Sequence, residues 1–250
     1  YVYFGDGSAA AQTFSGNAIV LMGGNGNNTL YNYNNGSGAA GTLTIASTVN
    51  VHGKSGLVNN IYANGTIVNQ GTISADVAGG TLTVGGIGTV SNQGPLEAMN
   101  GGALSINGSW TNSSTITATS STLNFGNGSN PWSNTGTITA TSSTVNLGGS
   151  FTRTGLGTFN RTGGSVNLVG LMTGNLALDA TTGSWNLKGG TLRNGTLSES
   201  GDALLVGTSS GGTLDGVTVE GDLDLTQQNG AFLTVKNNLV LNGTLFLGKA

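Results

Sequence analysis

The chain has 250 residues, of which only 7% are charged, and its formal net charge is −3. Its seven lysines and arginines are scattered from Lys54 to Lys249. Without a basic cluster, neither nucleic-acid binding nor attraction to an acidic membrane surface is expected. Cysteine is absent, which excludes disulfides, thiolate metal sites and cysteine nucleophiles.

Glycine and proline point to an ordered β structure. The chain has 46 glycines but only 2 prolines, and Val, Ile, Leu and Thr recur along its whole length. Disordered chains are instead rich in charge and proline and poor in β-branched residues. No apolar run approaches the roughly 18–20 residues that span a bilayer, so no direct membrane insertion is expected.

Residues 1–40 are predicted to form an irregular N-terminal coil or a boundary with preceding coils. Asparagine and glycine at 25–28 and 32–36 suggest loops there. The chain opens at Tyr1 without a basic and apolar signal segment, so we expect an export signal upstream of it. We likewise expect further chain, or head-to-tail assembly, after Ala250.

Residues 41–190 are predicted to form regular coils of a β-solenoid. The clearest repeat is TITATSSTLNFG, from Thr115 to Gly126, which returns 22 residues later as TITATSSTVNLG, from Thr137 to Gly148. Each unit holds two short alternating runs separated by turn residues. Such a unit of about 21–22 residues cannot bury its own apolar face, whereas stacked units form a continuous core.

Alternation within the repeat assigns its side chains to two faces. Ile116, Ala118, Leu123 and Phe125 share the inner face, and polar residues share the outer one. Stacking of equivalent strands then predicts ladders of identical polar side chains. The members of these ladders are Thr115, Thr117 and Thr119 over Thr137, Thr139 and Thr141, together with Asn124 over Asn146.

Residues 191–250 are predicted to continue the solenoid with longer, more apolar strands. The run GGTLDGVTVEGDLDLTQQNGAFLTVKNNLVLNGTLFLG, from Gly211 to Gly248, resembles the strand-repeat regions of very large exported bacterial proteins. Residues 68–84 and 157–168 give the same resemblance. Autotransporter passengers and filamentous-haemagglutinin-like exoproteins are similar in composition and coil length. The resemblance implies a parallel β-helix on a cell surface or in a secreted fibre.

Parallel β-helices also include polysaccharide lyases and glycosidases, which need grouped carboxylates. Glu220, Asp222 and Asp224 form the only dense acidic group, and alternation places them on the outer face of one strand. A solvated face is the favoured interpretation, with a weak Ca²⁺ site as the alternative. The sole histidine, His52, is expected to be a surface turn residue. No catalytic residue and no cofactor are predicted.

The tryptophans offer a second possible ligand surface. Trp110 and Trp132 lie 22 residues apart and are expected to stack at a corner. The favoured interpretation is an aromatic stack that seals a coil edge, and a glycan-contacting strip is the alternative. Trp185 is expected to be structural.

The predicted function is that of a non-catalytic structural or adhesive segment of a large secreted or cell-surface bacterial protein. Its partners would be further coils of the same polypeptide, or head-to-tail copies, and surface glycans. One alternative is a carbohydrate-binding or polysaccharide-degrading β-helix. A second is an ice-binding solenoid that uses the threonine rows, although Pro95, Glu97 and Arg161 are expected to interrupt them in neighbouring coils.

Overall fold

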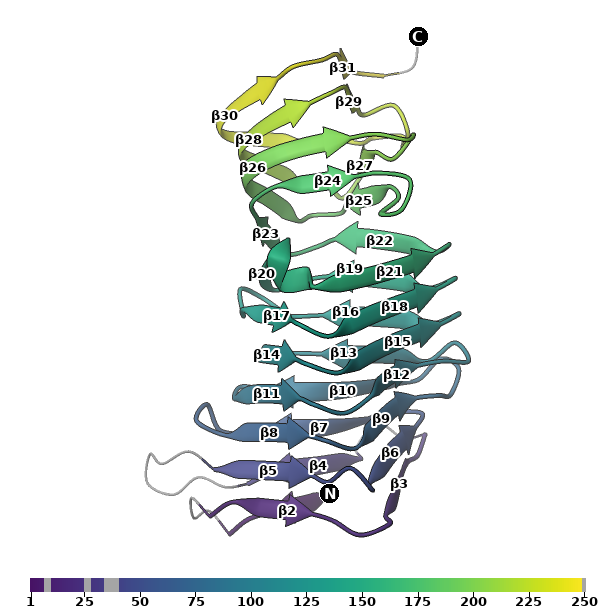
Figure 1. Ribbon diagram of the computed structural model, residues 1–250, viewed down its shortest axis with the longest axis vertical. Coiled ribbons are helices and arrows are strands. Elements are labelled where there is room, and N and C mark those ends of the chain that lie inside the picture. The colour runs from purple at the N-terminus through teal and green to yellow at the C-terminus, as the bar shows by residue number, and fades with distance from the viewer. Residues whose placement is uncertain (7–9, 25–27, 34–40, 249–250) are drawn as a thin grey trace.

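The computed structural model describes residues 1–6, 10–24, 28–33 and 41–248. It is an all-β parallel solenoid of about nine turns with coils of about 22 residues, which confirms the predicted fold class (Figure 1). In the described part the only helical segment is a short 3₁₀ turn, η1 (Thr154–Leu156). Residues 25–27 and 34–36, which we expected in loops, lie outside the described residues.

Three parallel sheets run along the stack and enclose the core (Figure 1). Sheet A consists of β1 (Val2–Phe4), β4 (Thr29–Asn32), β7 (Gly56–Asn60), β10 (Thr81–Gly86), β13 (Ala103–Ile106), β16 (Thr122–Phe125), β19 (Thr144–Leu147), β22 (Ser165–Leu168), β25 (Trp185–Leu187) and β27 (Leu205–Gly207). Sheet B consists of β2 (Gln12–Phe14), β5 (Thr42–Ile45), β8 (Thr66–Asn69), β11 (Thr89–Asn92), β14 (Ser109–Asn112) and β17 (Trp132–Asn134). Sheet C consists of β3 (Ile19–Met22), β6 (Asn50–Gly53), β9 (Thr72–Ala75), β12 (Leu96–Ala98), β15 (Thr115–Thr119), β18 (Thr137–Thr141) and β21 (Thr158–Thr162).

A fourth sheet continues sheets B and C toward the C-terminus. Sheet D consists of β20 (Ser150–Thr152), β23 (Leu171–Thr173), β26 (Thr191–Glu199), β28 (Thr213–Glu220) and β30 (Thr234–Leu241), with β24 (Leu176–Leu178) also paired to β26. The last pair is β29 (Leu223–Asp224) with β31 (Leu245–Phe246). Residues 1–40 contribute β1 to β4, so this segment carries the first strands of all three sheets.

Each regular coil therefore has three strands, whereas the sequence pattern suggested two. The additional strand belongs to sheet B, and it has a single inward apolar residue, such as Val90, Trp110 or Trp132. The next inward position is a buried asparagine, so the strand shows no apolar alternation. Period-2 reasoning depends on that alternation and misses such a strand.

In-register pairing places equivalent apolar residues directly over one another. On sheet C, Ile73, Leu96, Ile116 and Ile138 form one inward column, and each is completely buried. Burial of an aliphatic side chain of this size contributes about 1.5–3 kcal/mol relative to leaving it exposed. The core is therefore a set of continuous columns that each additional coil extends.

Buried amides support the corner between sheets B and C. The asparagine ladder consists of Asn69, Asn92, Asn112 and Asn134, all at most 2% exposed. Each of the first three donates from Nδ2 to Oδ1 of the next, at 2.8, 2.5 and 2.6 Å. The same Nδ2 atoms also donate to the carbonyl oxygen two residues ahead, for example Gly94 O at 2.7 Å from Asn92. The ladder thus supplies hydrogen bonds to turn carbonyls that burial removes from water.

The neighbours of the ladder explain where it starts and stops. Below Asn69 the register places Ile45, which has no donor, and Asn69 Oδ1 is buried without a hydrogen-bond partner. At the other end Asn134 Nδ2 donates to the carbonyl of Leu156 in η1, at 2.9 Å. Beyond that point the corner has a different geometry. A single residue with positive φ bends each of β26 and β28, Asn194 at 50° and Gly216 at 64°, whereas β30 has two, Asn237 and Asn238.

We predict that Asn92→Ala lowers the free energy of unfolding by about 1–3 kcal/mol, because it leaves Asn69 Nδ2 and Asn112 Oδ1 without their ladder partners. Urea unfolding followed by circular dichroism measures the change. The adjacent exposed residue gives the control, Gln93→Ala, which should stay within about 0.5 kcal/mol of the original chain. Equal effects of the two substitutions would contradict the role of the ladder.

Candidate functional site

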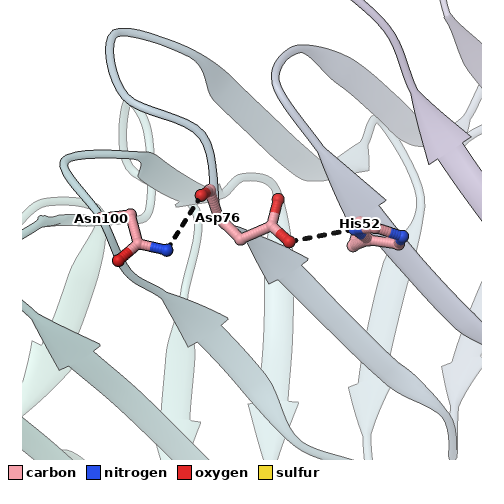
Figure 2. Close-up of polar contacts among 3 residues, drawn as sticks. All are labelled: His52, Asp76 and Asn100. Carbon is pink, nitrogen blue, oxygen red and sulfur yellow. Dashed lines mark hydrogen bonds and ion pairs between the residues drawn. The ribbon is translucent and has the colours of Figure 1, made fainter.

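One polar group on the outer surface is built around the single histidine of the chain. His52 lies on the outer face of β6, and its Nδ1 is 2.9 Å from Oδ2 of Asp76, which directly follows β9 (Figure 2). Asn100 Nδ2 donates to the backbone oxygen of Asp76 at 3.3 Å (Figure 2). His52 was expected in a turn, but it sits on a strand beside a carboxylate. An aspartate at Nδ1 orients an imidazole in the way that catalytic triads do.

A buried serine is the register partner of His52 on the next strand of sheet C. Ser74 lies in register between His52 and Glu97 on sheet C and is 5% exposed. Its Oγ has no hydrogen-bond partner, so it is not bonded to His52. A nucleophile and its base need that contact. The His52–Asp76 pair is therefore present, but the hydroxyl of Ser74 beside it is not hydrogen-bonded to the imidazole.

The acidic group near the C-terminus is divided between two strands, so its predicted placement on one strand face is wrong. Glu220 ends β28, Gly221 turns the chain at a φ of 140°, and Asp224 lies on β29. The φ of Gly221 is open mainly to glycine, which places a corner inside the acidic run. Among the described residues, no three His, Cys, Asp or Glu side chains are grouped to hold a metal ion.

Each of these three carboxylates accepts hydrogen bonds from a different set of neighbouring groups. Glu220 accepts from Asn242 Nδ2 at 3.0 Å, and Asp222 accepts from the backbone N–H of Thr244 at 2.7 Å. Asp224 accepts from the side chain of Gln227 at 2.6 Å and from the backbone N–H of Thr226 at 2.7 Å. Hydrogen bonds from Gln227 and Thr226 lower the pKa of Asp224. The bonds support the corner between sheet D and β29.

The tryptophan pair lies inside the solenoid, on sheet B. The rings of Trp110 and Trp132 are 4.7 Å apart and nearly parallel, at 4°, and Phe151 continues the stack at 4.5 Å from Trp132. Trp110 is 2% and Trp132 4% exposed. Both rings line a depression of about 500 Å³ together with residues that include Ser91 and Thr111. Both rings are almost completely buried and so offer little surface to a sugar, and glycan contact at these residues stays a prediction. Trp185 is fully buried.

The predicted polar ladders are positioned by strand register. Thr115, Thr117 and Thr119 face Thr137, Thr139 and Thr141 on sheet C, and Asn146 Nδ2 donates to Asn124 Oδ1 at 2.7 Å on sheet A. Asn167 and Asn186 extend the asparagine row, at 2.7 and 2.8 Å. The next strand of sheet C places Thr158 and Thr162 over Thr137 and Thr141. Arg161 was expected to interrupt the outer threonine rows. It is instead the register partner of buried Ala140, so it does not interrupt them.

A cluster that the sequence analysis missed contains all five tyrosines of the chain. We define the tyrosine cluster as Tyr1, Tyr3, Tyr31, Tyr33 and Tyr62. Its rings form one connected series, with contacts from Tyr1 to Tyr31 to Tyr3 and then to Tyr33 and Tyr62, at centroid distances of 4.9–5.8 Å. The available signal was the alternation in Tyr-Val-Tyr at residues 1–3 and in Tyr-Asn-Tyr at 31–33. Alternation puts both tyrosines of each pair on one face.

A charged column crosses sheet D. The register aligns Arg193, Asp215 and Lys236 on neighbouring strands. Asp215 Oδ2 accepts from Arg193 Nε at 2.7 Å, and its Oδ1 accepts from Asn237 Nδ2 at 2.6 Å. The hydrogen bond from Asn237 and the bond from Arg193 lower the pKa of Asp215 below its usual 3.8. Glu199 differs, because burial raises its pKa.

No protein-family model matches this sequence, and neither a curated protein nor a solved structure is found to be similar to it. The described residues form no helix that is long and apolar enough to cross a membrane. What is shown is therefore the architecture, a parallel β-solenoid of about nine turns.

We predict that the stability deficit of Asp215→Asn is full above pH 4 and shrinks as the pH falls below 3.8. The folded-state pKa of Asp215 is depressed, so the ionised carboxylate stabilises the fold above its unfolded pKa. That contribution disappears as the carboxylate protonates on acidification. Thermal unfolding of both proteins from pH 7 to about pH 3 measures it. Thr218→Ala on β28, which removes no titrating group, is the control. An unchanged Asp215→Asn deficit at low pH would refute the assignment.

Proposed function

We propose that this chain is a non-catalytic structural and adhesive segment of a large exported bacterial protein, secreted or held at the cell surface. Its coils join further coils end to end, either of the same polypeptide or of head-to-tail copies. The observation that supports this most directly is the state of the two terminal coils. At each end, one inward side chain is about half exposed although its register partner one coil further in is buried.

At the N-terminal end, Val2 is 50% exposed although its register partner Leu30 is 4% exposed. At the C-terminal end, Val235 is 49% exposed, and its partner Leu214 is completely buried. The strands at these ends, β1 and β30, each pair on one side only in the described part of the chain. Unpaired edges of this kind are templates for further strands.

Parallel stacking makes the two ends complementary rather than identical. The unpaired backbone N–H and C=O groups at the C-terminal edge can form parallel pairs with the N-terminal edge of another copy, so copies join head to tail. Such a heterologous contact does not close on itself and generates open filaments. The resemblance of Gly211–Gly248 to strand repeats of exported bacterial proteins supports an extracellular location.

Val235→Lys is predicted to prevent end-to-end assembly, because a charge then lies on the apolar end surface and one blocked end is enough to stop head-to-tail growth. Sedimentation velocity and electron microscopy across a concentration series measure it. The matched control is Val77→Lys, at a 40% exposed valine in a side turn, which should assemble like the original chain. A monodisperse original chain at high concentration would overturn the assembly proposal.

A second candidate function is ice binding by the outer face of sheet C. It is favoured by the extension of two of the three threonine rows to a third strand through Thr158 and Thr162, while Asn160 continues the central row. Such rows place hydroxyls at the regular spacings of the sheet, about 4.8 Å across strands and about 6.8 Å along them. Flat and repeated hydroxyl positions are what a crystalline water surface requires.

If this face binds ice, a concentrated solution shows thermal hysteresis, and Thr139→Lys abolishes it by placing a charged chain in the centre of the array. Thr111→Lys on the outer face of sheet B is the control and should keep the hysteresis. Absence of hysteresis in the original chain eliminates this candidate and leaves the stacking proposal untouched.

A further inference from the structure

Tryptophan and tyrosine occupy different parts of this solenoid. All three tryptophans are buried, at 0–4% exposure. The five tyrosines are all in the tyrosine cluster, where Tyr1 is 68% and Tyr3 55% exposed. Tyrosine differs from phenylalanine by a hydroxyl that both donates and accepts hydrogen bonds. The tyrosine cluster therefore combines aromatic rings with hydroxyl groups at one surface.

The rings of the cluster stack along the solenoid axis. Tyr3 and Tyr31 are register partners on neighbouring strands of sheet A. Their centroids are 4.9 Å apart and their planes differ by 14°, so the stacking distance is close to the usual strand separation of about 4.8 Å. Tyr1 stacks on the same Tyr31 at 5.8 Å. Tyr1 and Tyr3 thus lie side by side, each contacting Tyr31 and each more than half exposed.

This surface lies outside the core. Val2, between Tyr1 and Tyr3 in the sequence, is in register with buried Leu30 and belongs to the inner face. The tyrosines therefore flank the apolar end surface. Because Tyr3 stacks on Tyr31 along the axis, a further coil paired with β1 would cover the outer ring faces of Tyr1 and Tyr3, so a ligand on the tyrosine cluster and a further coil on β1 exclude each other.

The surroundings of the cluster carry almost no charge. Between Tyr1 and Gly53 the only charged side chain is Asp6, and the first basic one is Lys54. Phosphate, sulfate or polyanion recognition needs arginine or lysine, and none is supplied here. The next position above Tyr31 in the sheet A column is Asn59, whose amide adds donor and acceptor capacity. The surface is aromatic, neutral and able to form hydrogen bonds.

From these observations we propose that the tyrosine cluster binds a neutral oligosaccharide. The C–H faces of a sugar stack on the open rings of Tyr1 and Tyr3, while its hydroxyls exchange hydrogen bonds with the tyrosine hydroxyls. Two residues along a strand are about 6.8 Å apart, so neighbouring rings can contact adjacent sugar units. This inference rests on the adhesive part of the proposed function, and it places the glycan contact on tyrosines rather than on Trp110 and Trp132.

The distribution of the aromatic residues allows a site-specific experiment. Incorporation of 3-fluorotyrosine gives ¹⁹F signals from the tyrosine cluster alone, because the chain has no other tyrosine. Titration uses cellohexaose, laminarihexaose and mannohexaose as neutral probes and hexagalacturonate as an anionic one. The Val235→Lys background is chosen because it removes end-to-end assembly and leaves the tyrosine cluster intact. A parallel sample with 5-fluorotryptophan reports on the buried interior.

We expect at least one neutral hexasaccharide to shift the fluorotyrosine signals saturably, with no shift of the fluorotryptophan signals. Tyr3→Ala should weaken binding about three- to tenfold, and Tyr3→Phe should weaken it less because the ring is kept. Ile19→Ala is the control, since it removes a 74% exposed side chain from the same coil on sheet C and should leave the affinity unchanged.

Three outcomes would overturn the proposal. They are no response to any neutral probe, equal binding of hexagalacturonate, and equal weakening by Ile19→Ala and Tyr3→Ala. Fluorotyrosine shifts that follow protein concentration alone, in the chain without the Val235→Lys change, would assign the cluster to contact between copies instead. If the tyrosines fail to respond while that chain still assembles, the glycan proposal falls and the stacking proposal stands.

Discussion

In-register parallel pairing is the constraint on which the rest of this structure depends. Because backbone hydrogen bonds join each strand to its equivalent one coil away, the nearest neighbour of a side chain is its counterpart in the next coil. Ile116 lies against Ile138, Trp110 against Trp132 and Asn92 against Asn112. Apolar and amide residues tolerate this pairing well, since amides both donate and accept. Like charges repel, which accounts for the low content of charged residues; the column of Arg193, Asp215 and Lys236 alternates in sign.

The same constraint determined what could be predicted from the sequence. The near-identical units at 115–126 and 137–148 gave the coil length, the inward residues and the polar rows. The strands of sheet B were missed because a buried asparagine replaces their second apolar position. The acidic group was misplaced because Gly221 breaks the alternation on which the prediction relied. Arg161 was predicted to interrupt the outer rows, but its register with Ala140 puts it on the inner side.

Candidate sites show the same division between local pattern and stacking. Glycan contact was sought at the tryptophans because their spacing equals one coil, but that spacing is also what a buried stack requires. Tyr3 and Tyr31 are separated by more than one regular period, since the first coil is longer, and only the register reveals them as partners. His52 and Asp76 likewise come together because one strand lies over the next. In a solenoid a surface site is thus assembled across coils, and each sheet displays its own stripe of chemistry.

The asparagine ladder also bears on how the rod would respond to mechanical load. Strands lie across the long axis, so their backbone hydrogen bonds point along it, and tension applied to the two ends acts on successive coils in series (Figure 1). Coils then detach singly, each releasing about 70 Å of chain for some 22 residues. Between β8 and β17 the amides of Asn69, Asn92, Asn112 and Asn134 add a second set of bonds in the same direction. Peeling would meet added resistance there and along the row from Asn124 to Asn186 on sheet A, so these stretches would hold longer than coils without amide rows.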